Sequence, residues 1–383
     1  MNLAIFFAGS GQKVKDPKLV YTAWANQLTQ SGYATLLCDG VGQFIGTNGV
    51  TGAGWAKIIQ CAMTWVENHA AAGGAPDKVI VVGMSRGGVQ TVICANCLKT
   101  AFPQSKVFVF AIDPVQGAHV GMNDGSFDMR SKRWGSKGSR DDLKARYRLS
   151  DDAPKTVPDN VRMYLSVLAQ FRGRDRGMKW GFTPQSPTLQ NMTCRAEESK
   201  VYELPGDHST GVQTGKNSDG SAHAYAASRA ARGAVTQEMF AHWLRLTGFA
   251  KIQSDPLIPA FEQYCRIANE DLGGVQIAGK SSGFSFLRAS KMRNHNFTDT
   301  ANSRGLKGRG HLVASSQVKR SGGYFVNERH HEIWTSVEHM LGILARNDRE
   351  SLLQRYPNIV RWQAHNLGFE TITMNDILNL FNW

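Results

Sequence analysis

The N-terminal part of the chain alternates short apolar runs with helical patterns, and this alternation restricts the fold more than any other feature. Four runs have apolar side chains at nearly every position: residues 3–7, 34–38, 78–82 and 106–112. Between them, apolar residues recur with the three- and four-residue spacing of an amphipathic helix, over residues 18–30, 54–69 and 86–100. Strands that are apolar throughout are typical of a parallel sheet buried on both faces. The sequence therefore predicts an α/β fold, with a mostly parallel sheet and helices on both of its faces.

The same alternation divides the chain into two regions. It is interrupted by a polar, basic insertion at about 116–158 and then resumes, with strands expected at 160–169 and 199–204 and a helix at about 225–247. From about residue 251 the alternation is lost, and a long stretch rich in Gly, Ser, Arg and Asn follows. We therefore predict one α/β domain over residues 1–250 and a C-terminal extension, mainly helical and irregular, over residues 251–383.

One apolar run leads directly into a serine that is flanked by glycines. Residues 83–87 read Gly-Met-Ser-Arg-Gly and lie between the run at 78–82 and a helical pattern, so this G-x-S-x-G sequence marks a strand–turn–helix junction. In that context Ser85 would occupy a sharp turn at the end of the sheet, and Gly83 and Gly87 would let strand and helix approach closely. The junction predicts a nucleophilic serine.

Residues at other strand ends supply the partners that such a serine requires. Asp39 and Asp113 follow predicted strands, and ligands of parallel sheets bind beyond these carboxyl ends. His208 follows the last predicted strand and is the expected base, with His119 as the reserve. Asp113 is the expected acid, since the order serine, acid, histidine along the chain belongs to α/β-hydrolases. Asp175, which follows the next predicted strand, is the competing acid.

Two backbone N–H groups are expected to stabilise the oxyanion of an attacked ester. The N–H of Arg86 begins the helix after Ser85, where backbone donors have no partner within the helix. The second donor is expected in the small-residue loop after the first strand, at Gly9 or Ser10. Serine chemistry of this kind uses neither a metal nor another cofactor, and the sequence predicts none.

Three segments resemble the motifs of one enzyme family. Residues 83–88 (GMSRGG) resemble the G-F-S-R-G-A elbow of an α/β-hydrolase family that includes type VI secretion lipase effectors. Residues 113–117 (DPVQG) resemble its D-T-V-G segment, and residues 204–209 (LPGDHS) resemble its F-P-G-x-H-S-D loop. These segments occur in the family's order, and the similarity covers roughly residues 1–250.

The resemblance implies an activity and a role for each motif residue. Carried over by position, Ser85 would be the nucleophile, Asp113 the acid and His208 the base, in an enzyme that hydrolyses carboxylic esters. The family's substrates are often phospholipids, and some of its members are antibacterial toxins. The chain departs from the family at residues 8–12, where AGSGQ replaces the opening D-G-T-x-N, and at Thr210, which replaces the final aspartate of the histidine loop.

Positive charge is concentrated in one part of the chain. The net charge is +13, and residues 130–180 contain fourteen Lys or Arg against six Asp. Such an excess is typical of a partner that carries phosphate, either an anionic membrane surface or nucleic acid, and equally of a solvated surface. The aromatic residues of the segment are widely spread and no recognised binding motif accompanies them, which argues against nucleic acid.

Two classes of function are therefore compared. The first is a serine esterase of the lipase or phospholipase type, acting on an ester or phospholipid substrate; as a secreted effector, it would also have an inhibitor or delivery partner. The second is a catalytically silent basic α/β protein that binds nucleic acid or another polyanion, because a fold does not imply a function. An activated serine at position 85 distinguishes the two.

Cysteine usage and the N-terminus bear on the cellular compartment. The six cysteines are scattered and several lie in apolar segments, which predicts buried thiols in a reducing compartment. Cys94 and Cys97 have no second pair that would complete a zinc site. The N-terminus is apolar but lacks a basic leader, and it is interpreted as the first strand. We expect synthesis in the cytoplasm, with any export independent of a cleaved signal peptide.

Overall fold

In a computed structural model of the chain, the described residues are 1–45, 54–114, 137–151, 153–169, 188–189, 200–204, 210–222, 230, 233–234, 236–237, 239–241, 243–244, 248, 311–312 and 325–326. The strands are β1 (Asn2–Phe7), β2 (Ala34–Cys38), β3 (Lys78–Met84), β4 (Lys106–Ile112), β5 (Thr156–Val157), β6 (Val161–Ala169), β7 (Thr188–Leu189), β8 (Lys200–Leu204), β9 (His311–Leu312) and β10 (Phe325–Val326). The helices are α1 (Tyr21–Gln30), α2 (Trp55–Gly73), α3 (Arg86–Ala101) and α4 (Lys137–Tyr147), with short 3-10 turns η1 (Ala153–Lys155) and η3 (Thr210–Val212). The described residues between 230 and 244 are also helical.

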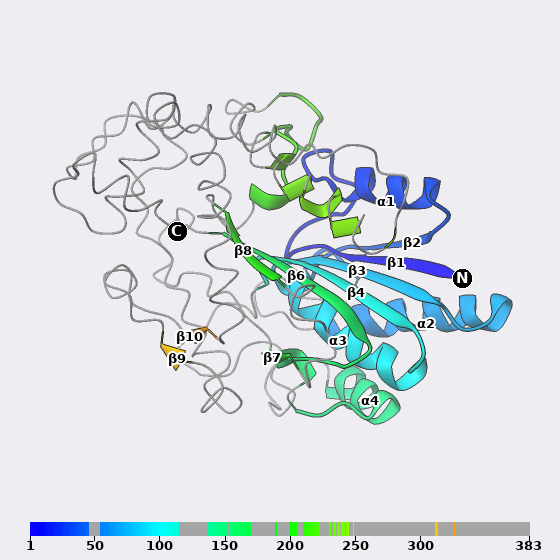
Figure 1. Cartoon of the computed structure of the whole chain (residues 1–383). Coiled ribbons are helices and arrows are strands. Elements are labelled where there is room, and N and C mark those ends of the chain that lie inside the picture. Colours follow the sequence, from blue (N-terminus) through cyan, green and yellow to red (C-terminus); the bar gives the residue numbers. More distant parts are fainter. Residues whose placement is uncertain are drawn as a thin grey trace.

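Six described strands form one sheet in the order β2-β1-β3-β4-β6-β8 (Figure 1). Every neighbouring pair in this sheet is parallel. The carboxyl ends of the strands therefore meet at one edge, and the residues that follow them are neighbours. The chain passes from β1 to β2 on one side and then returns to place β3 on the other side of β1. The strand order thus reverses between β1 and β3, and such a switch point is where ligands of open α/β sheets bind.

Helices cover both faces of this sheet (Figure 1). On one face α2, α3 and α4 pack against alternate strand residues such as Ile5, Val81 and Val109, which are fully buried. On the other face an aromatic cluster joins α1, β4 and the helical residues between 230 and 244. Its ring centroids lie 6.1 Å apart for Trp24 and Phe110 and 5.1 Å apart for Phe110 and Phe240. The predicted α/β-hydrolase-like arrangement, a parallel sheet with helices on both faces, is confirmed.

The first helix begins later than its apolar spacing predicts. The prediction started it at Lys18, whereas α1 begins at Tyr21. Leu19 instead forms an antiparallel bridge with Gln213, and the N–H of Val20 donates to the carbonyl of Val212 at 3.0 Å. Contacts with a segment almost 200 residues away hold these residues outside the helix, and no local pattern contains that information.

Helix α4 lies inside the region predicted as a polar insertion, and no helix was expected there. Its hydrophilic sequence (KGSRDDLKARY) presents two apolar residues four positions apart, Leu143 and Tyr147, and both are buried in the core beside α2 and α3. The Tyr147 hydroxyl donates to Glu67 of α2 at 2.8 Å. Two buried apolar residues in a short helix are too few for a periodic signal, and the third buried residue of α4, Arg140, is charged.

The cysteine prediction is confirmed for three residues and wrong for one. Cys38, Cys94 and Cys97 are buried free thiols, whereas Cys61 on α2 is exposed. Burial raises the pKa of Cys94 to about 12, so this thiol stays neutral at physiological pH. Cys194 and Cys265 lie outside the described residues. So does the C-terminal extension apart from β9 and β10, which pair with each other, and the domain boundary at residue 250 stays a prediction.

Candidate active site

Ser85 occupies the turn between β3 and α3 in a backbone conformation that is rare for a residue with a side chain. Its φ is 56° and its ψ is −125°, and α3 begins at the next residue, Arg86. Strained conformations of this kind cost about 1–3 kcal/mol and persist where the surrounding structure enforces them. The residue is 5% exposed. The strand–turn–helix junction predicted around Ser85 is therefore present, with the serine at its apex.

Three glycines in this turn lack the Cβ atoms that would otherwise clash with neighbouring residues. A Cβ on Gly83 would lie 2.2 Å from the carbonyl oxygen of Gly87, so the end of β3 and the start of α3 touch through their backbones. A Cβ on Gly87 would lie 2.2 Å from the carbonyl oxygen of Phe7, which packs α3 onto the end of β1. A Cβ on Gly88 would lie 2.8 Å from Pro114. Each glycine thus serves a separate contact at the carboxyl edge of the sheet.

Asp113 follows β4, the neighbour of β3, and is also strained. Its φ is 43°, a left-handed value that Asp tolerates better than most residues, and it is 1% exposed. Its N–H donates to the carbonyl of Val167 in β6 at 2.6 Å. The N–H of Ser85 donates to the carbonyl of Ile112 at 2.9 Å. The structure therefore brings the predicted nucleophile and the predicted acid to adjacent strand ends.

The predicted oxyanion residues meet at the switch point between β1 and β3. A Cβ on Gly9 would lie 3.3 Å from the Cβ of Ser85, so the loop after β1 passes directly beside the serine. The Arg86 guanidinium donates to the hydroxyl of Ser10 at 2.9 Å. Burial lowers the pKa of Arg86 to about 10, which leaves it charged at neutral pH. The N–H of Gly9 donates to the side chain of Gln12 at 2.8 Å, a contact that the sequence did not indicate.

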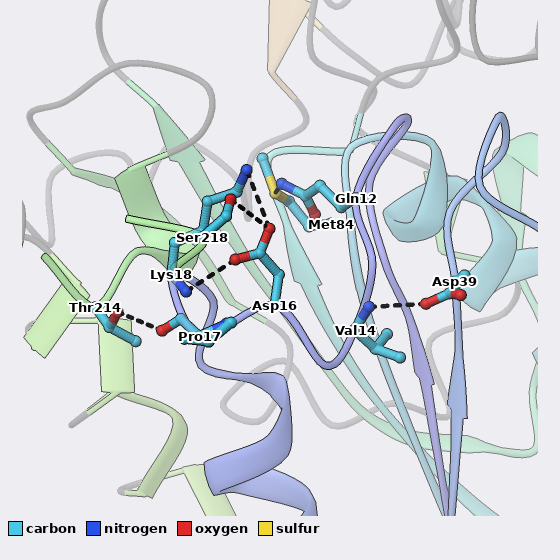
Figure 2. Close-up of polar contacts among 9 residues, drawn as sticks. All are labelled: Gln12, Val14, Asp16, Pro17, Lys18, Asp39, Met84, Thr214 and Ser218. Atoms are coloured by element: carbon cyan, nitrogen blue, oxygen red, sulfur yellow. Dashed lines mark hydrogen bonds and ion pairs between the residues drawn. The ribbon is translucent and has the colours of Figure 1, made fainter. Parts of the chain in front are cut away.

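Further along, the loop after β1 is anchored at three places (Figure 2). Gln12 contacts Met84, the residue before the serine, and the N–H of Val14 donates to Asp39 at 2.8 Å. The third anchor is the segment of residues 214–218. There the hydroxyl of Thr214 donates to the carbonyl of Pro17 at 2.8 Å, and the hydroxyl of Ser218 donates to Asp16 at 3.0 Å. Asp39 thus holds the loop, which accounts for an aspartate at this strand end outside the predicted triad.

Several predicted site residues lie outside the described residues: His208, His119 and Asp175. The described residues on either side of His208 are Leu204, which ends β8, and Thr210, which begins η3. Gly211 in that turn packs against the strand that leads to Asp113, because a Cβ on it would lie 2.9 Å from Cγ2 of Ile112. The predicted acid and base assignments stay predictions.

Neither a group of metal ligands nor a membrane-spanning helix occurs in the part of the chain that the structure describes. Within the described ranges, no group of three or more His, Cys, Asp or Glu side chains is placed to hold a metal ion. No helix in this part of the chain combines the length and the apolar character needed to cross a membrane.

Comparison with known proteins finds no sequence family and a set of distant structural likenesses. No protein-family model and no curated protein matches the chain. The chain is similar to ferulic-acid-bound Est1E from Butyrivibrio proteoclasticus, with 13% identity over 54% of this chain and 81% of that one (TM-score 0.31). It is similar to carboxyl esterase 2 from Tuber melanosporum, with 13% identity over 66% of this chain and 78% of that one (TM-score 0.32). A protein from Pseudomonas aeruginosa, described as uncharacterized, has 12% identity over 99% of this chain and 63% of its own (TM-score 0.37). These TM-scores are below 0.5, so the fold assignment follows from the strand order and pairing described above.

Proposed function

We propose that this chain is a serine hydrolase that cleaves carboxylic esters through an acyl-enzyme. The observation that carries the proposal is the conformation of Ser85, strained at the apex of a glycine-packed turn beside the β1–β3 switch point. Strain at one residue, in a turn that three glycines allow to pack closely, is typical of a functional site. A serine that merely ended a strand would adopt an unstrained backbone conformation.

In the proposed mechanism, the Ser85 hydroxyl attacks the ester carbonyl while His208 accepts its proton. Asp113 orients the imidazole and stabilises the imidazolium that forms. Backbone N–H groups of Arg86 and of the loop at Gly9 and Ser10 stabilise the oxyanion of the tetrahedral intermediate. The intermediate collapses, His208 returns the proton to the leaving alcohol, and water then hydrolyses the acyl-enzyme by the same steps.

The choice of His208 and Asp113 rests on the described residues around them. His208 precedes Gly211 by three residues in the sequence, and Gly211 packs against Ile112 at the end of β4. Asp113 is buried at that same strand end, next to the Ser85 backbone. Asp175, six residues after the end of β6, is the competing acid.

The substrate class and the cellular role are a further part of the proposal. The motifs of the chain resemble those of lipase effectors, and we propose that the basic segment at 130–180 holds the enzyme on anionic lipid headgroups. The enzyme would then be a phospholipase or lipase that is made in the cytoplasm and acts as a secreted effector. Residues 251–383 would form a cap or a contact surface for membrane or partner.

Labelling with a fluorophosphonate probe tests the proposed activity. The wild-type chain is expected to be labelled, whereas Ser85→Ala and His208→Ala are not, because each removes part of the activated nucleophile. His69→Ala, on α2, is the matched control and should be labelled like wild type. Folded wild-type chain that stays unlabelled, with and without liposomes, contradicts the proposal. Salt-sensitive retention of DNA by the Ser85→Ala variant would then support the alternative of a silent polyanion-binding protein.

A separate experiment tests the membrane role of the basic segment. Neutralising Arg172, Arg174 and Arg176 together is expected to weaken binding to anionic liposomes while leaving hydrolysis of a short soluble ester unchanged. An equal loss of both would show that these arginines do not act through docking.

A further inference from the structure

The side chain of Gln12 holds the turn that lies beside Ser85. Its Oε1 accepts hydrogen bonds from the N–H of Gly9 at 2.8 Å and from the hydroxyl of Tyr21 at 3.1 Å, and its Nε2 lies 3.3 Å from the sulfur of Met84. The N–H of Gly9 can only donate, so the atom that faces it must be the carbonyl oxygen of the amide. The orientation of the Gln12 side chain is therefore chemically determined.

Backbone hydrogen bonds fix the same turn from the other side. The N–H of Gln12 donates to the carbonyl of Gly9 at 3.0 Å, which closes a four-residue turn, and Gly11 has the positive φ of 70° that such a turn accommodates. The N–H of Gly11 donates to the carbonyl of Val41 at 2.9 Å, and the N–H of Gly40 donates to the carbonyl of Gln12 at 3.0 Å. The turn is thus attached to the loop after β2 as well.

Of the four backbone N–H groups in the turn of residues 9–12, that of Ser10 is available to donate to a ligand. The N–H groups of Gly9, Gly11 and Gln12 are all engaged, whereas the N–H of Ser10 has no acceptor among the described residues. The Ser10 hydroxyl accepts a hydrogen bond from Arg86, the residue after Ser85. This hydrogen bond therefore connects Ser10 to the turn between β3 and α3, which carries the proposed nucleophile Ser85.

We propose that Gln12 is a positioning residue for the oxyanion site, with the N–H of Ser10 as its second donor. By occupying the N–H of Gly9, Gln12 orients the turn so that the Ser10 N–H acts with the Arg86 N–H. Gly9 contributes space, because a Cβ there would lie 2.9 Å from Oε1 of Gln12. This inference rests on the proposed function. The sequence predicts the second oxyanion donor at either Gly9 or Ser10, and this inference assigns it to the N–H of Ser10.

A positioning role of this kind has a distinct kinetic signature. Oxyanion donors act on the transition state and not on the bound ester, so their misplacement lowers kcat and leaves KM unchanged. Removing one such donor outright costs about 10²–10³-fold in kcat, and a displaced donor should cost less. A residue that only stabilised the fold would change the melting temperature without this selectivity.

The test compares Gln12→Met, which keeps the length of the side chain and removes its polar atoms, with the wild-type chain on p-nitrophenyl butyrate. We expect kcat to fall about 10- to 100-fold while KM stays within about threefold. Affinity for a trifluoromethyl ketone of matched acyl length, which binds as an oxyanion, should fall by the same factor as kcat/KM. Ser218→Ala is the control, since it loosens the same loop far from the turn and should leave all three values unchanged.

Each outcome separates the two proposals. Unchanged kcat in Gln12→Met, or a loss of kcat without loss of ketone affinity, overturns the role of Gln12 and leaves the hydrolase proposal standing. A wild-type chain that neither hydrolyses the ester nor binds the ketone overturns both.

If Gln12→Met does not fold, Gln12→Glu carries the test, because it keeps the acceptor for Gly9. Its carboxylate would repel the oxyanion, so kcat should fall with a new pH dependence as Glu ionises, and the absence of this dependence overturns the inference.

Discussion

The N–H of Ser85 donates a 2.9 Å hydrogen bond to the carbonyl oxygen of Ile112, the residue that precedes Asp113. A backbone bond therefore joins Ser85 to the strand end that leads to Asp113. Both have positive φ values, 56° for Ser85 and 43° for Asp113. Ser85 is thus held by β4, and Asp113 by β6 through its N–H bond to Val167, so two neighbouring strained residues form a rigid base for the proposed chemistry.

Replacing Ser85 by glycine should stabilise the fold relative to alanine. Alanine keeps the strain of the positive φ, whereas glycine adopts it freely, and the gain is only partly offset by the greater freedom of glycine in the unfolded chain. We expect Ser85→Gly to unfold in urea with about 1 kcal/mol more free energy than Ser85→Ala. Both variants lack the nucleophile, so activity does not enter the comparison. Equal stabilities would mean that the turn imposes no strain.

Asparagine substitutions distinguish the two candidate acids. Asn has the size of Asp and tolerates a positive φ, so Asp113→Asn should fold normally. If Asp113 orients His208, this variant should lose about 10²–10⁴-fold in kcat, and Asp175→Asn should lose less than about tenfold. The measurement is steady-state hydrolysis of a soluble ester, with melting temperatures to confirm the fold. The reverse pattern would assign the acid to Asp175.

The glycine that packs α3 onto β1 should not tolerate a side chain. A Cβ on Gly87 would lie 2.2 Å from a backbone oxygen of Phe7, which cannot move without displacing β1. We expect Gly87→Ala to destabilise the chain by about 3 kcal/mol or more. Gly73→Ala at the end of α2 is the control, because its Cβ would make only an ordinary 3.6 Å contact with Met1. That variant should be neutral or stabilising by up to about 1 kcal/mol, and similar losses in both would contradict the packing argument.

These results show which parts of the site the sequence could reveal. Strand ends were predictable because buried parallel strands are apolar throughout, and so Ser85 and Asp113 were found at neighbouring ends. Gln12 was not, since a lone polar residue in a loop has no periodicity, and its five hydrogen bonds join it to residues as far apart in the chain as Gly9 and Met84. One feature of the sequence pointed to Gln12: it is the last residue of AGSGQ, the segment that replaces the family's opening motif. The contacts of Asp16 and Pro17 with residues 214–218 were equally beyond local reasoning.

Helix α4 provides a test of a region whose polar sequence predicted an insertion outside the core. Leu143 is fully buried among residues of α2 and α3. We expect Leu143→Ala to lower the free energy of unfolding by about 2–5 kcal/mol, as large-to-small changes in packed cores do. Lys57→Ala, at an exposed position on the neighbouring α2, should change it by less than about 0.5 kcal/mol. A Leu143 variant as stable as this control would place α4 outside the cooperative core.

Asp16 should make the stability of the loop anchor depend on pH. Burial alone would raise the pKa of this carboxyl, but hydrogen bonds from the Lys18 N–H and the Ser218 hydroxyl, together with the Lys18 charge, hold it below its ordinary value of 3.8. The folded chain therefore binds a proton less readily than the unfolded chain, and the stabilisation is complete above the ordinary pKa and lost as pH falls through the lowered one. Urea unfolding of wild type and Asp16→Asn should differ most above about pH 5, and the two should converge as the pH falls below the ordinary pKa of 3.8. A difference that is constant over this range would exclude the carboxylate as its source.

The bond between Asp16 and Ser218 joins residues 202 positions apart, and that between Pro17 and Thr214 joins residues 197 apart. During synthesis, the strand and helix around Ser85 emerge well before the segment that completes the neighbouring loop. At a translation rate of about 5–20 residues per second, roughly 10–40 s pass between the appearance of Asp16 and that of Ser218. A nascent chain can therefore build most of the sheet while the loop beside the serine still lacks its last anchor. The last contacts of this loop therefore form only after residues 214–218 have been synthesised.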